Sequence, residues 1–581
     1  MSERIYIGVA WPYANGSLHL GQIAGAYLPA DIFARYHRMK GNQVLMVSGS
    51  DQHGTPITLR AEREGVEPGA IATRYHQEFL ESWQKLGISF DLFTSTGTAN
   101  HTRVVQKVFL SLLEKGYIYR GIVSQPFCPQ CQRFLTDRYI GGTCPYCRSE
   151  KARGDQCDDC GKPLNAAELI QPQCSFCDEA PEFRDSEHFF LKLSAFQDRL
   201  LEWVKKKDSW RQNVRNFTIS YLEGGLHDRA ITRDIGWGVP LPLPGFEGKR
   251  IYVWFEAVIG YLSATKEWAK SSGDEERWQD FWQGDKAKGY YFIGKDNIIF
   301  HTVIWPAMLM GYGNLNLPYD VPANEFLTIE GRKLSTSRNW AVWLPDYLSR
   351  YDPDPLRYLL SISMPETSDT DFSWGEFIRR NNDELVATYG NLVHRVLTFT
   401  YRQFDGCVPK HSRYDDFSMF LDDLDEGNDI GTICPDMDNH SIDMIEDAKE
   451  AFRSMDLLLS KCQFRQAIMR AMSLAQDANR YLDMKSPWKV IKEDRQAAAD
   501  SLYIALCVIS HLSKLLYPFL PFSSQKLHEY LGFAGNVEDD GWRLHSPTPG
   551  QKLLPPEPLF SKLDEELAGE ESARLRQSSS E

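Results

Sequence analysis

The chain has no long apolar run and no leader-like start. No stretch approaches about 18 uninterrupted apolar residues, the length that a membrane-spanning helix needs. The nearest run, residues 501–522, is interrupted by His511, Lys514 and two prolines, so we expect a buried helix there. The first ten residues, MSERIYIGVA, lack a basic segment, a long apolar segment and a small-residue cleavage site. We therefore expect a cytoplasmic protein with no signal peptide and no membrane partner.

The chain also has fewer bases than acids, with 64 Lys and Arg against 79 Asp and Glu and a formal net charge of −15. Phosphate binding favours basic surfaces, so this average argues weakly against a nucleic-acid partner. Much of the acid lies in residues 415–450, however, and basic clusters lie elsewhere. At 581 residues the chain is too long for one hydrophobic core, which predicts two to four domains.

Strand-like and helix-like segments alternate over the first 115 residues. The predicted strands are 4–10 and 43–50, and the predicted helices are 19–39 and 68–86. This order is typical of a parallel sheet covered by helices. Residues 116–230 break the pattern, and strand-like segments return at 250–256 and 289–295. We therefore predict an α/β domain of the Rossmann type, whose sheet is completed by chain that follows an insertion.

From residue 376 onward the apolar spacing is helical. The predicted helices are 376–404, 445–484 and 495–517. The last twenty residues are polar, and we expect them to be frayed. The predicted divisions are 1–115 and 231–325 for the two halves of the α/β domain, 116–230 for the insertion, 326–375 for a mobile-loop region, 376–535 for an all-α domain and 536–581 for a C-terminal tail.

Eight of the twelve cysteines form four Cys-x-x-Cys pairs. The pairs are Cys128 with Cys131, Cys144 with Cys147, Cys157 with Cys160, and Cys174 with Cys177. A two-residue gap lets two thiolates reach one tetrahedral ion, so eight thiolates predict one or two structural zinc sites. We expect nesting, in which the inner two pairs share one ion and the outer two share the other. Iron–sulfur ligation and free buried cysteines are the alternatives.

The segment WPYANGSLHLGQ, residues 11–22, joins the first predicted strand to the first predicted helix. The amino end of a helix offers free N–H groups and a positive dipole, which suit a phosphate. Asn15 and Gly16 allow close backbone approach, Gly21 leaves room for a flat base, and His19 can donate to phosphate oxygens. Taken alone, His-x-Gly also fits a histidine that merely begins a helix.

A second polar segment, EGRKLSTSRN at residues 330–339, carries Lys333, Ser335 and Arg338. A mobile basic loop that closes on a triphosphate has this composition, although so does an ordinary solvated loop. The two segments together, in this order around an α/β domain, predict a nucleotide site more specifically than either does alone.

These segments resemble a known family. HLGQ and KLSTS are similar to the two signatures of class I aminoacyl-tRNA synthetases, normally His-x-Gly-His and Lys-Met-Ser-Lys-Ser. Within that class, PYANGSLHLG, SGSDQHGTP, YVWFEAVIGY, FIGKDNIIFHTVIWPAML and the knuckles resemble methionyl-tRNA synthetases, most closely the branch with four knuckles. The resemblance runs from about residue 4 to about residue 530.

The resemblance implies a ligase that activates methionine with ATP and Mg²⁺ and transfers it to the 3′ end of methionine transfer RNA. It implies a Rossmann catalytic domain followed by an anticodon-binding bundle. Because no RNA-binding barrel follows residue 535, we expect a monomer. The implied catalytic residues are His19, Gln22, Lys333, Thr336 and Arg338. The implied ATP-binding residues are Asn15, Gly16, His19, Gly21, Gly294, Lys295, Asp296, Lys333 and Ser335.

In the implied methionine pocket, Asp51 pairs with the ammonium group and the Tyr261 hydroxyl reaches the sulfur. The pocket residues are Trp11, Tyr13, Asp51, Trp254, Ala257, Tyr261, Asn297 and His301. Each aromatic residue also fits plain core packing. The implied anticodon readers are Asn391 and Arg395, four apart on one helix face, and Trp488, which can stack on an unpaired base. Trp488 also fits a capping role at a helix end.

Two positions depart from the signatures. Gln22 replaces the second histidine and Thr336 replaces the second lysine. We expect Gln22 to weaken ATP binding without abolishing it, and Lys333 or Arg338 to supply the missing charge. The alternatives are a degenerate paralogue that binds RNA or nucleotide, and a small nucleotidylyltransferase, which the length, the knuckles and the helical half disfavour.

Overall fold

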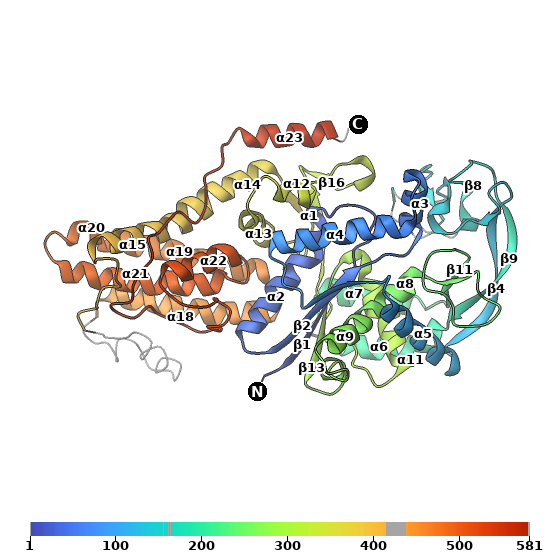
Figure 1. Ribbon diagram of the computed structural model, residues 1–581, viewed down its shortest axis with the longest axis horizontal. Coiled ribbons are helices and arrows are strands. Elements are labelled where there is room, and N and C mark those ends of the chain that lie inside the picture. The colour runs from blue at the N-terminus through green and yellow to red at the C-terminus, as the bar shows by residue number, and fades with distance from the viewer. Residues whose placement is uncertain are drawn as a thin grey trace.

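The computed structural model describes residues 2–154, 156–157, 159–160, 162, 164, 166–413 and 437–578, so the first part of the acidic stretch 415–450 lies outside it. A five-stranded parallel sheet lies at the centre, with the helical C-terminal half at one end and the insertion at the other (Figure 1). The strands, in sheet order, are β14 (Ala323–Asn324), β13 (Ala287–Gly294), β1 (Arg4–Val9), β2 (Gln43–Ser50) and β3 (Leu92–Ser95). The predicted α/β class is confirmed.

Strand β13, which follows the insertion, pairs in parallel with β1 from Arg4↔Ala287 to Val9↔Phe292. The sheet is therefore completed by the later chain, as predicted. After Arg4, strand β1 carries no polar side chain other than the Tyr6 hydroxyl, because its two faces enter different cores. Ile5 and Ile7 pack into the core that is shared with the helical half, whereas Tyr6 packs into the core on the other face.

Helices cover both faces of the sheet. The predicted helix 19–39 is a continuous run of α1 (Leu20–Gln22), the π-helical segment η1 (Ile23–Tyr27) and α2 (Leu28–Met39). The predicted helix 68–86 is α4 (Pro68–Leu86). The remaining helices of this half are α3 (Thr55–Glu64), α5 (Ala99–Glu114), α9 (Gly260–Ser271), α10 (Gln279–Trp282) and α11 (Trp305–Tyr312).

The strand predicted at 250–256 is wrong. Strand β12 (Arg250–Ile251) ends after two residues, and helix α8 (Val253–Glu256) begins directly after Tyr252. A short apolar run is compatible with a buried strand or a buried helix, and periodicity cannot separate them. Val253, Phe255 and Glu256 are buried, whereas Trp254 is only half-buried. The run therefore lies beside the candidate site.

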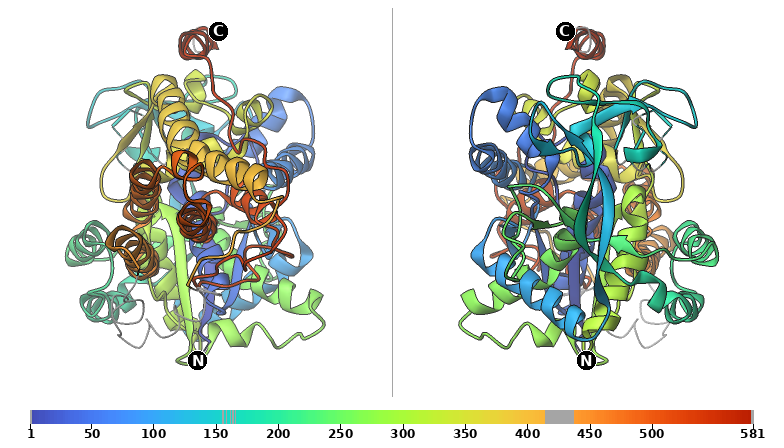
Figure 2. Two further views of the ribbon diagram at one scale, coloured as in Figure 1. Left: turned by 90° about the vertical axis from the view of Figure 1, so that its left-hand side faces the viewer. Right: turned by 90° about the vertical axis from the view of Figure 1, so that its right-hand side faces the viewer.

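The insertion is built on a long antiparallel ribbon of β4 (Ile118–Cys128) and β9 (Glu182–Leu191). The right-hand view of Figure 2 shows this ribbon in front of the sheet. At its far end lie the cysteine knuckles and a small sheet of β7 (Ala152–Arg153), β6 (Ile140–Thr143) and β8 (Ile170–Cys174). The chain returns through α6 (Gln197–Lys205) and α7 (Gln212–Glu223).

The region after the sheet carries a three-stranded sheet and then the helical half, which the left-hand view of Figure 2 sees end-on. The sheet is β16 (Arg332–Lys333), β15 (Leu327–Ile329) and β17 (Thr370–Phe372), and along the chain α12 (Leu344–Leu348) and α13 (Pro353–Ile362) lie between β16 and β17. The helical half contains α14 (Trp374–Arg380), η9 (Asn381–Gly390), α15 (Asn391–Gln403), α18 (Asn439–Ser460), α19 (Phe464–Lys485), α20 (Pro487–Val490), α21 (Arg495–Leu516) and α22 (Pro521–Tyr530).

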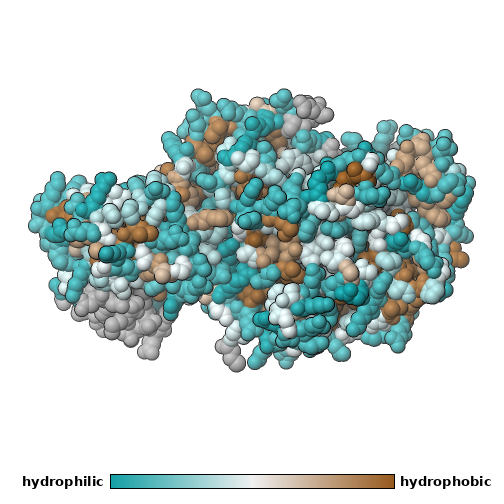
Figure 3. Space-filling view, viewed as in Figure 1, coloured by the Kyte–Doolittle hydropathy of each residue, from teal (hydrophilic) through white to brown (hydrophobic). Residues whose placement is uncertain are grey.

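The helical predictions hold, with two differences in detail. The helix at 376–404 contains the π-helical segment η9, and the helical region 445–484 breaks at Cys462, whose φ of 55° is left-handed. Among the described residues one helix, Arg495–Leu516, has the length and apolar composition of a membrane span, but 94% of that window is buried inside the protein. On the face shown in Figure 3, polar residues predominate and hydrophobic ones are scattered.

The C-terminal tail is not frayed as expected over its described part. Residues Leu567–Ser578 form α23, which packs against α14. Leu575 and Glu571 are only 5% and 6% exposed, and the Tyr351 hydroxyl donates to Glu571 over 3.0 Å. Arg350 also pairs with Glu571. The polar composition gave no sign of this packing, because it depends on two buried side chains and on polar contacts with distant residues such as Tyr351 and Arg350.

Candidate functional site

The turn after β1 lies at the carboxyl edge of the parallel sheet, where open α/β sheets bind their ligands. The turn runs beside the end of β2, since Ala14 N donates to Asp51 O and Asp51 N donates to Pro12 O, both over 2.8 Å. Arg60 of α3 donates to Asn15 O over 2.6 Å, and its guanidinium also lies next to Gly16. Arg60, which the sequence did not single out, therefore fixes this turn.

His19 is the N-cap of the long helix that follows. Its Nδ1 accepts a hydrogen bond from Gln22 N over 3.3 Å, and Gln22 Oε1 accepts one from His19 N over 3.0 Å. Burial lowers the pKa of His19 to about 4, so the ring is neutral at pH 7. Because Nδ1 is an acceptor, the proton sits on Nε2, which is left as a donor. Gln22 thus completes a capping box, and its amide nitrogen remains able to donate.

The second polar segment lies against this turn. Leu20 N donates to Val342 O over 3.1 Å, and Leu344 N donates to Leu18 O over 2.7 Å. A Cβ on Gly21 would lie 3.1 Å from a methyl of Leu334, so in this conformation the room beside Gly21 is taken by the loop. The two segments predicted from sequence to act together are therefore neighbours in space.

Two lysines near this turn, one on the loop and one in the Gly294–Asp296 segment, differ in their ion-pair partners. Lys333 is exposed. Partial desolvation raises the pKa of Asp296 above its usual value, and the charges of Lys333 and Lys295 act in the opposite direction. Lys295 itself pairs with Glu325 and Asp369, each over 2.8 Å. The charge of Lys333 thus acts on Asp296, while Lys295 has carboxylate partners that a phosphate would have to replace.

The other end of the loop is a short turn. Thr336 and Arg338 are exposed, and Arg338 Nε donates to Ser335 Oγ over 3.2 Å. The guanidinium of Arg338 therefore lies on the same exposed loop as Lys333.

Gly294 lies outside this loop. A Cβ on Gly294 would meet nothing within 4 Å, so the backbone there is open to a flat ligand.

The predicted pocket residues converge between β1, β2 and α9. Trp254 stacks on Phe300 with centroids 4.5 Å apart, and Tyr13 meets Trp254 edge-on at 6.0 Å. The Tyr261 oxygen lies 2.7 Å from His301 Nε2, and His301 Nδ1 lies 2.9 Å from Asn297 O. Ala257 lies one helical turn before Tyr261 and is half-buried.

Proton positions in this pocket follow from the acceptors. Asn297 O can only accept, so His301 carries its proton on Nδ1. Burial lowers the pKa of His301 to about 4, which keeps the ring neutral and leaves Nε2 with a lone pair. Tyr261 therefore donates its proton to His301, whereas the sequence analysis had expected that hydroxyl to reach a sulfur.

A buried network that the sequence analysis missed lies behind Asp51. Glu256 is fully buried and accepts from His53 Nδ1 at 2.7 Å and from His101 Nε2 at 2.5 Å. The backbone N–H of His53 donates to Asp51 Oδ1 over 3.2 Å. Burial opposes ionisation of Glu256, but His53 and His101 lower its pKa to about 2. His53 and Glu256 lie inside SGSDQHGTP and YVWFEAVIGY, two of the segments that carry the family resemblance, and that was the available signal; His101 gave none.

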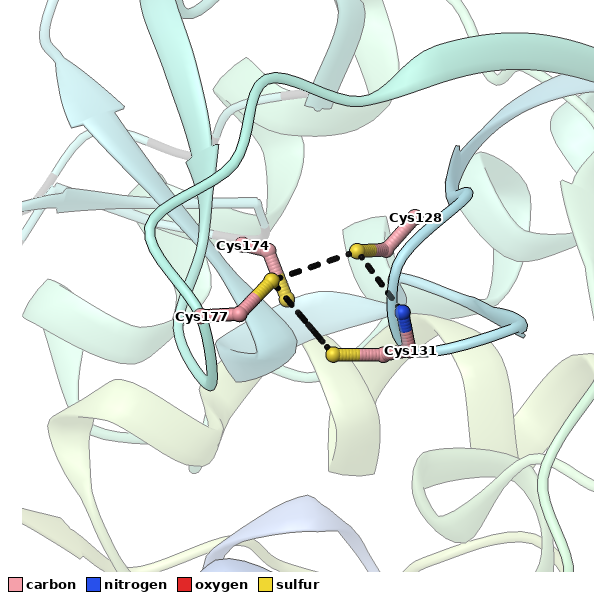
Figure 4. Close-up of side chains that lie close together, drawn as sticks. All are labelled: Cys128, Cys131, Cys174 and Cys177. Atoms are coloured by element: carbon pink, nitrogen blue, oxygen red, sulfur yellow. Dashed lines mark hydrogen bonds between the residues drawn. The ribbon is translucent and has the colours of Figure 1, made fainter.

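The cysteines form two clusters, each with its four sulfurs within 4.8 Å of one another. The inner pairs, Cys144 with Cys147 and Cys157 with Cys160, make one cluster, and the outer pairs, Cys128 with Cys131 and Cys174 with Cys177, make the other (Figure 4). The predicted nesting is confirmed. Sulfur–sulfur separations within the clusters are 3.5 Å for Cys128–Cys177, 3.4 Å for Cys131–Cys177, 3.9 Å for Cys131–Cys174, 3.9 Å for Cys144–Cys160 and 3.6 Å for Cys147–Cys157.

These separations fit zinc. Four sulfurs at ~2.3 Å from a tetrahedral Zn²⁺ lie ~3.8 Å apart, far longer than a disulfide. Cys131 N also donates to Cys128 Sγ over 3.3 Å, a contact that stabilises a thiolate. With four thiolates and no open position, such an ion would supply structure and no catalytic water.

The outer cysteine cluster is connected to the first signature turn through α3. Arg133, beside Cys131, pairs with Glu62, and the Tyr139 hydroxyl lies 2.6 Å from Thr58 Oγ1. Both partners are on α3, whose Arg60 holds Asn15 O. Folding of the knuckles therefore bears on the position of the nucleotide turn.

Comparisons with known proteins match both halves of this arrangement. Residues 5–397 match the family described as tRNA synthetases class I (M), and residues 434–579 match the anticodon binding domain of methionyl tRNA ligase. A methionine–tRNA ligase of Dehalococcoides mccartyi is 62% identical over 575 residues, which cover 99% of this chain and 100% of that protein. The chain belongs to the methionyl-tRNA synthetase family.

Two further members of the methionyl-tRNA synthetase family are informative. A methionine–tRNA ligase of Thermomicrobium roseum is 50% identical, with 99% of both chains covered. The solved Mycobacterium tuberculosis methionyl-tRNA synthetase in complex with methionyl-adenylate is 25% identical, with a TM-score of 0.77 over 96% of this chain and 100% of that one. Its fold is therefore shared along nearly the whole chain.

In the helical half, the structure brings together two of the three residues expected to read the anticodon. The Arg395 guanidinium lies 4.4 Å from the ring centroid of Trp488 and 3.3 Å from Asp483 Oδ1. Asn391 lies one turn before Arg395 on α15 and is exposed. Trp488 follows Pro487 on α20 and is half-buried, so part of its ring is accessible. An aromatic face next to a guanidinium and an amide is suited to unpaired bases.

Proposed function

We propose that this chain activates L-methionine with ATP, forming methionyl-adenylate and pyrophosphate, and transfers the methionine to the 3′ end of methionine transfer RNA. The observation that carries the proposal is the contact between two distant segments at one helix amino end, through Leu20 N and Val342 O. A methionine carboxylate is already ionised, so the reaction needs no general base. Positioning and electrostatic stabilisation of the reacting phosphate supply the catalysis.

In this proposal His19 donates its Nε2 proton to the reacting phosphate, and Gln22 holds the histidine by the capping box. Lys333 and Arg338 supply charge to the triphosphate in place of a lysine at Thr336. Gly294 and Asp296 contact the adenosine, and Mg²⁺ enters with ATP and offsets the phosphate charge. Zinc bound by the knuckle cysteines would supply structure, while Arg133 and Tyr139 contact α3, whose Arg60 holds the turn at Asn15.

Asp51 pairs with the methionine ammonium group, and the aromatic residues Tyr13, Trp254 and Tyr261 enclose the side chain. A flexible, polarisable thioether packs well against such rings. Asn391, Arg395 and Trp488 contact the anticodon of the transfer RNA.

Methionine-dependent exchange of pyrophosphate into ATP tests the proposed function directly. We expect exchange with methionine and none with leucine or isoleucine. Replacing Lys333 or Arg338 by alanine is expected to lower kcat/KM for ATP by about 10- to 100-fold, the worth of one hydrogen bond to a charged group. Lys562→Ala, in the tail and far along the chain, is the matched control for loss of an exposed cation.

A degenerate paralogue that binds RNA or nucleotide is the second candidate, because Gln22 and Thr336 depart from both signatures. Failure of exchange with every amino acid, together with retained RNA binding, would favour it. Unchanged exchange in both the Lys333→Ala and Arg338→Ala variants would refute the assignment of the missing charge.

Methionine binding is expected to depend on pH through Asp51. Burial, and then the charge of Glu256, raises the pKa of Asp51 well above its usual value, although His53 N–H and the Thr96 hydroxyl act in the opposite direction. Below that pKa Asp51 is protonated and must lose a proton before it pairs with an ammonium. The KM for methionine should therefore be lowest above the raised pKa and should increase as the pH falls through it.

Glu256→Gln separates this effect from general damage. The variant keeps the shape of the side chain but removes the charge that raises the pKa of Asp51, so the increase in KM should move to lower pH. The KM for ATP, measured over the same pH range, is the control and should not move with it. Identical methionine profiles for the wild-type protein and Glu256→Gln would contradict the coupling.

A further inference from the structure

The loop of residues 330–339 begins at a two-residue turn whose first residue is unusual for its conformation. Strands β15 and β16 pair as a hairpin with Thr328 opposite Lys333, so Glu330 and Gly331 form the turn. Both have a left-handed backbone, with φ of 49° and 72°. Asparagine, aspartate and glycine are the residues that usually fill such turns, and a glutamate there is strained. Contacts of the Glu330 side chain are therefore expected to offset this strain.

Two groups from distant parts of the chain hold the Glu330 side chain. Its Oε1 accepts hydrogen bonds from Trp374 N over 3.0 Å and from Ser572 Oγ over 3.1 Å. Trp374 is the first residue of α14, where a carboxylate satisfies a free N–H and lies at the positive end of the helix dipole. Ser572 lies on α23, near the end of the chain. The turn is therefore anchored to the amino end of one helix and to the side of another.

Helix α23 is itself docked, so Ser572 is a fixed partner for the turn. Leu575 is part of the core that the sheet shares with the helical half. Glu571, the residue before Ser572, pairs with Arg350 and accepts a hydrogen bond from the Tyr351 hydroxyl. These contacts hold the Ser572 side of α23 toward the protein.

The cation that the proposed function assigns to the triphosphate lies directly beyond this turn. Lys333 is two residues after Gly331, is exposed, and its charge acts on Asp296. Its backbone pairs with Thr328 on the other arm of the hairpin. A shift of the turn therefore moves Lys333 relative to the Gly294–Asp296 segment.

We propose that Ser572 is a positioning residue for the use of ATP: through Glu330 it holds the turn that carries Lys333, so that docked helix α23 sets where the loop of residues 330–339 meets the triphosphate. This inference rests on the proposed function. Loss of the Ser572 hydroxyl removes one of the two hydrogen bonds to Glu330 and leaves the one from Trp374 N. The turn then moves more freely, and the cost falls on ATP rather than on methionine.

The kinetic test is methionine-dependent exchange of pyrophosphate into ATP by the full chain with Ser572→Ala. We expect kcat/KM for ATP to fall by about 3- to 10-fold, the worth of one hydrogen bond, while the KM for methionine stays within about twofold. Ser572→Thr keeps the hydroxyl and should restore the wild-type value. Ser561→Ala removes an exposed serine hydroxyl from the same tail and is the matched control, with neither constant changed. An unchanged kcat/KM for ATP in Ser572→Ala would overturn the inference.

A double-mutant cycle shows whether Ser572 acts through Lys333. In a Lys333→Ala background there is no cation left for the turn to position, so Ser572→Ala should lower kcat/KM for ATP by less than about twofold. Equal losses in the two backgrounds would mean that Ser572 acts on another part of the protein, and would overturn the inference.

Trypsin cleavage tests the contact without any substrate. Arg332 and Lys333 are exposed cleavage sites beside the turn. We expect Ser572→Ala to be cut there about 3- to 10-fold faster than the wild-type and Ser561→Ala proteins, as measured by mass spectrometry of the fragments. Equal cleavage rates would overturn the inference. If the wild-type protein shows no methionine-dependent exchange, the proposed function fails, whereas faster cleavage of Ser572→Ala would still show that α23 holds the turn.

Discussion

His19→Ala is expected to lower methionine-dependent pyrophosphate exchange by about 10²- to 10³-fold, the typical cost of one preorganised donor to a developing charge. His19 Nδ1 accepts from Gln22 N, which leaves Nε2–H as the donor, and the low pKa of about 4 keeps the ring neutral. The measurement is kcat/KM for ATP at pH 7.5. The same change removes an N-cap, so the variant should also lose about 1 kcal/mol of stability.

His19→Asp separates the two roles of the side chain. Aspartate caps helices as well as any residue, so this variant should unfold at the same temperature as the wild-type protein. It places a negative charge where the triphosphate is expected, so exchange should fall at least as far as in His19→Ala. A stable His19→Asp protein with near wild-type exchange would show that the phosphate does not contact this side chain.

Arg357→Met is expected to destabilise the protein by about 3–5 kcal/mol, the cost of breaking a buried charge network by removing one partner. Arg357 is fully buried on α13 and donates to Asp31 Oδ2 on α2 over 2.7 Å. It also donates to Phe519 O over 2.7 Å and to Pro518 O over 2.9 Å, in the segment after α21. One side chain thus connects the catalytic sheet to the helical half.

The charge on Asp31 depends on this network. Burial opposes its ionisation, but Arg35 and Arg357 hold its pKa well below the usual range. Loss of Arg357 should therefore also loosen the orientation of the helical half, so that charging of transfer RNA falls further than pyrophosphate exchange.

Urea unfolding measures the stability loss, and Arg74→Ala is the matched control. Arg74 pairs with Glu64 on the surface with half of its side chain exposed, so its removal should cost less than about 1 kcal/mol. If Arg357→Met unfolds within 1 kcal/mol of the wild-type protein, the buried network does not hold the two halves together.

Much of the fold follows from the sequence where local pattern and tertiary environment agree. Strands β1 and β2 are mostly apolar because helices cover both faces, and α4 ends before Gly87, whose left-handed φ of 76° closes a helix. The four Cys-x-x-Cys pairs also followed from spacing, because two residues between cysteines suffice for a knuckle, whereas the nesting of the pairs was a choice that the spacing alone did not require. These features depend on neighbours in the chain.

The predictions from sequence were wrong where residues far away along the chain determine the local structure. Residues 250–256 read as a strand because apolar residues surround Trp254, yet they form the start of a helix beside the pocket. The tail was predicted to be frayed because the ion pair that ties its helix to the body, between Glu571 and Arg350, spans more than 200 residues. Spatial neighbours such as Glu256 and His101 cannot be recognised by spacing, since only the fold brings them together.

In the candidate site, too, some residues could be found from local motifs and others only from the fold. His19 and Lys333 were found because each lies in a short local motif. Their joint action was predicted from their order around the α/β domain and from the resemblance. The structure places Leu334 of the second segment beside Gly21 of the first, and Val342, just after the second segment, accepts a hydrogen bond from Leu20 N. The tautomers of His19 and His301 required the three-dimensional neighbours of each ring.

The most direct test of the central idea is a crystal structure of the protein with a non-hydrolysable ATP analogue and Mg²⁺. The account predicts phosphate oxygens within hydrogen-bond distance of both His19 Nε2 and Lys333 Nζ, with the adenosine beside Gly294. A triphosphate bound away from His19, or with Lys333 still turned into solvent, would contradict it.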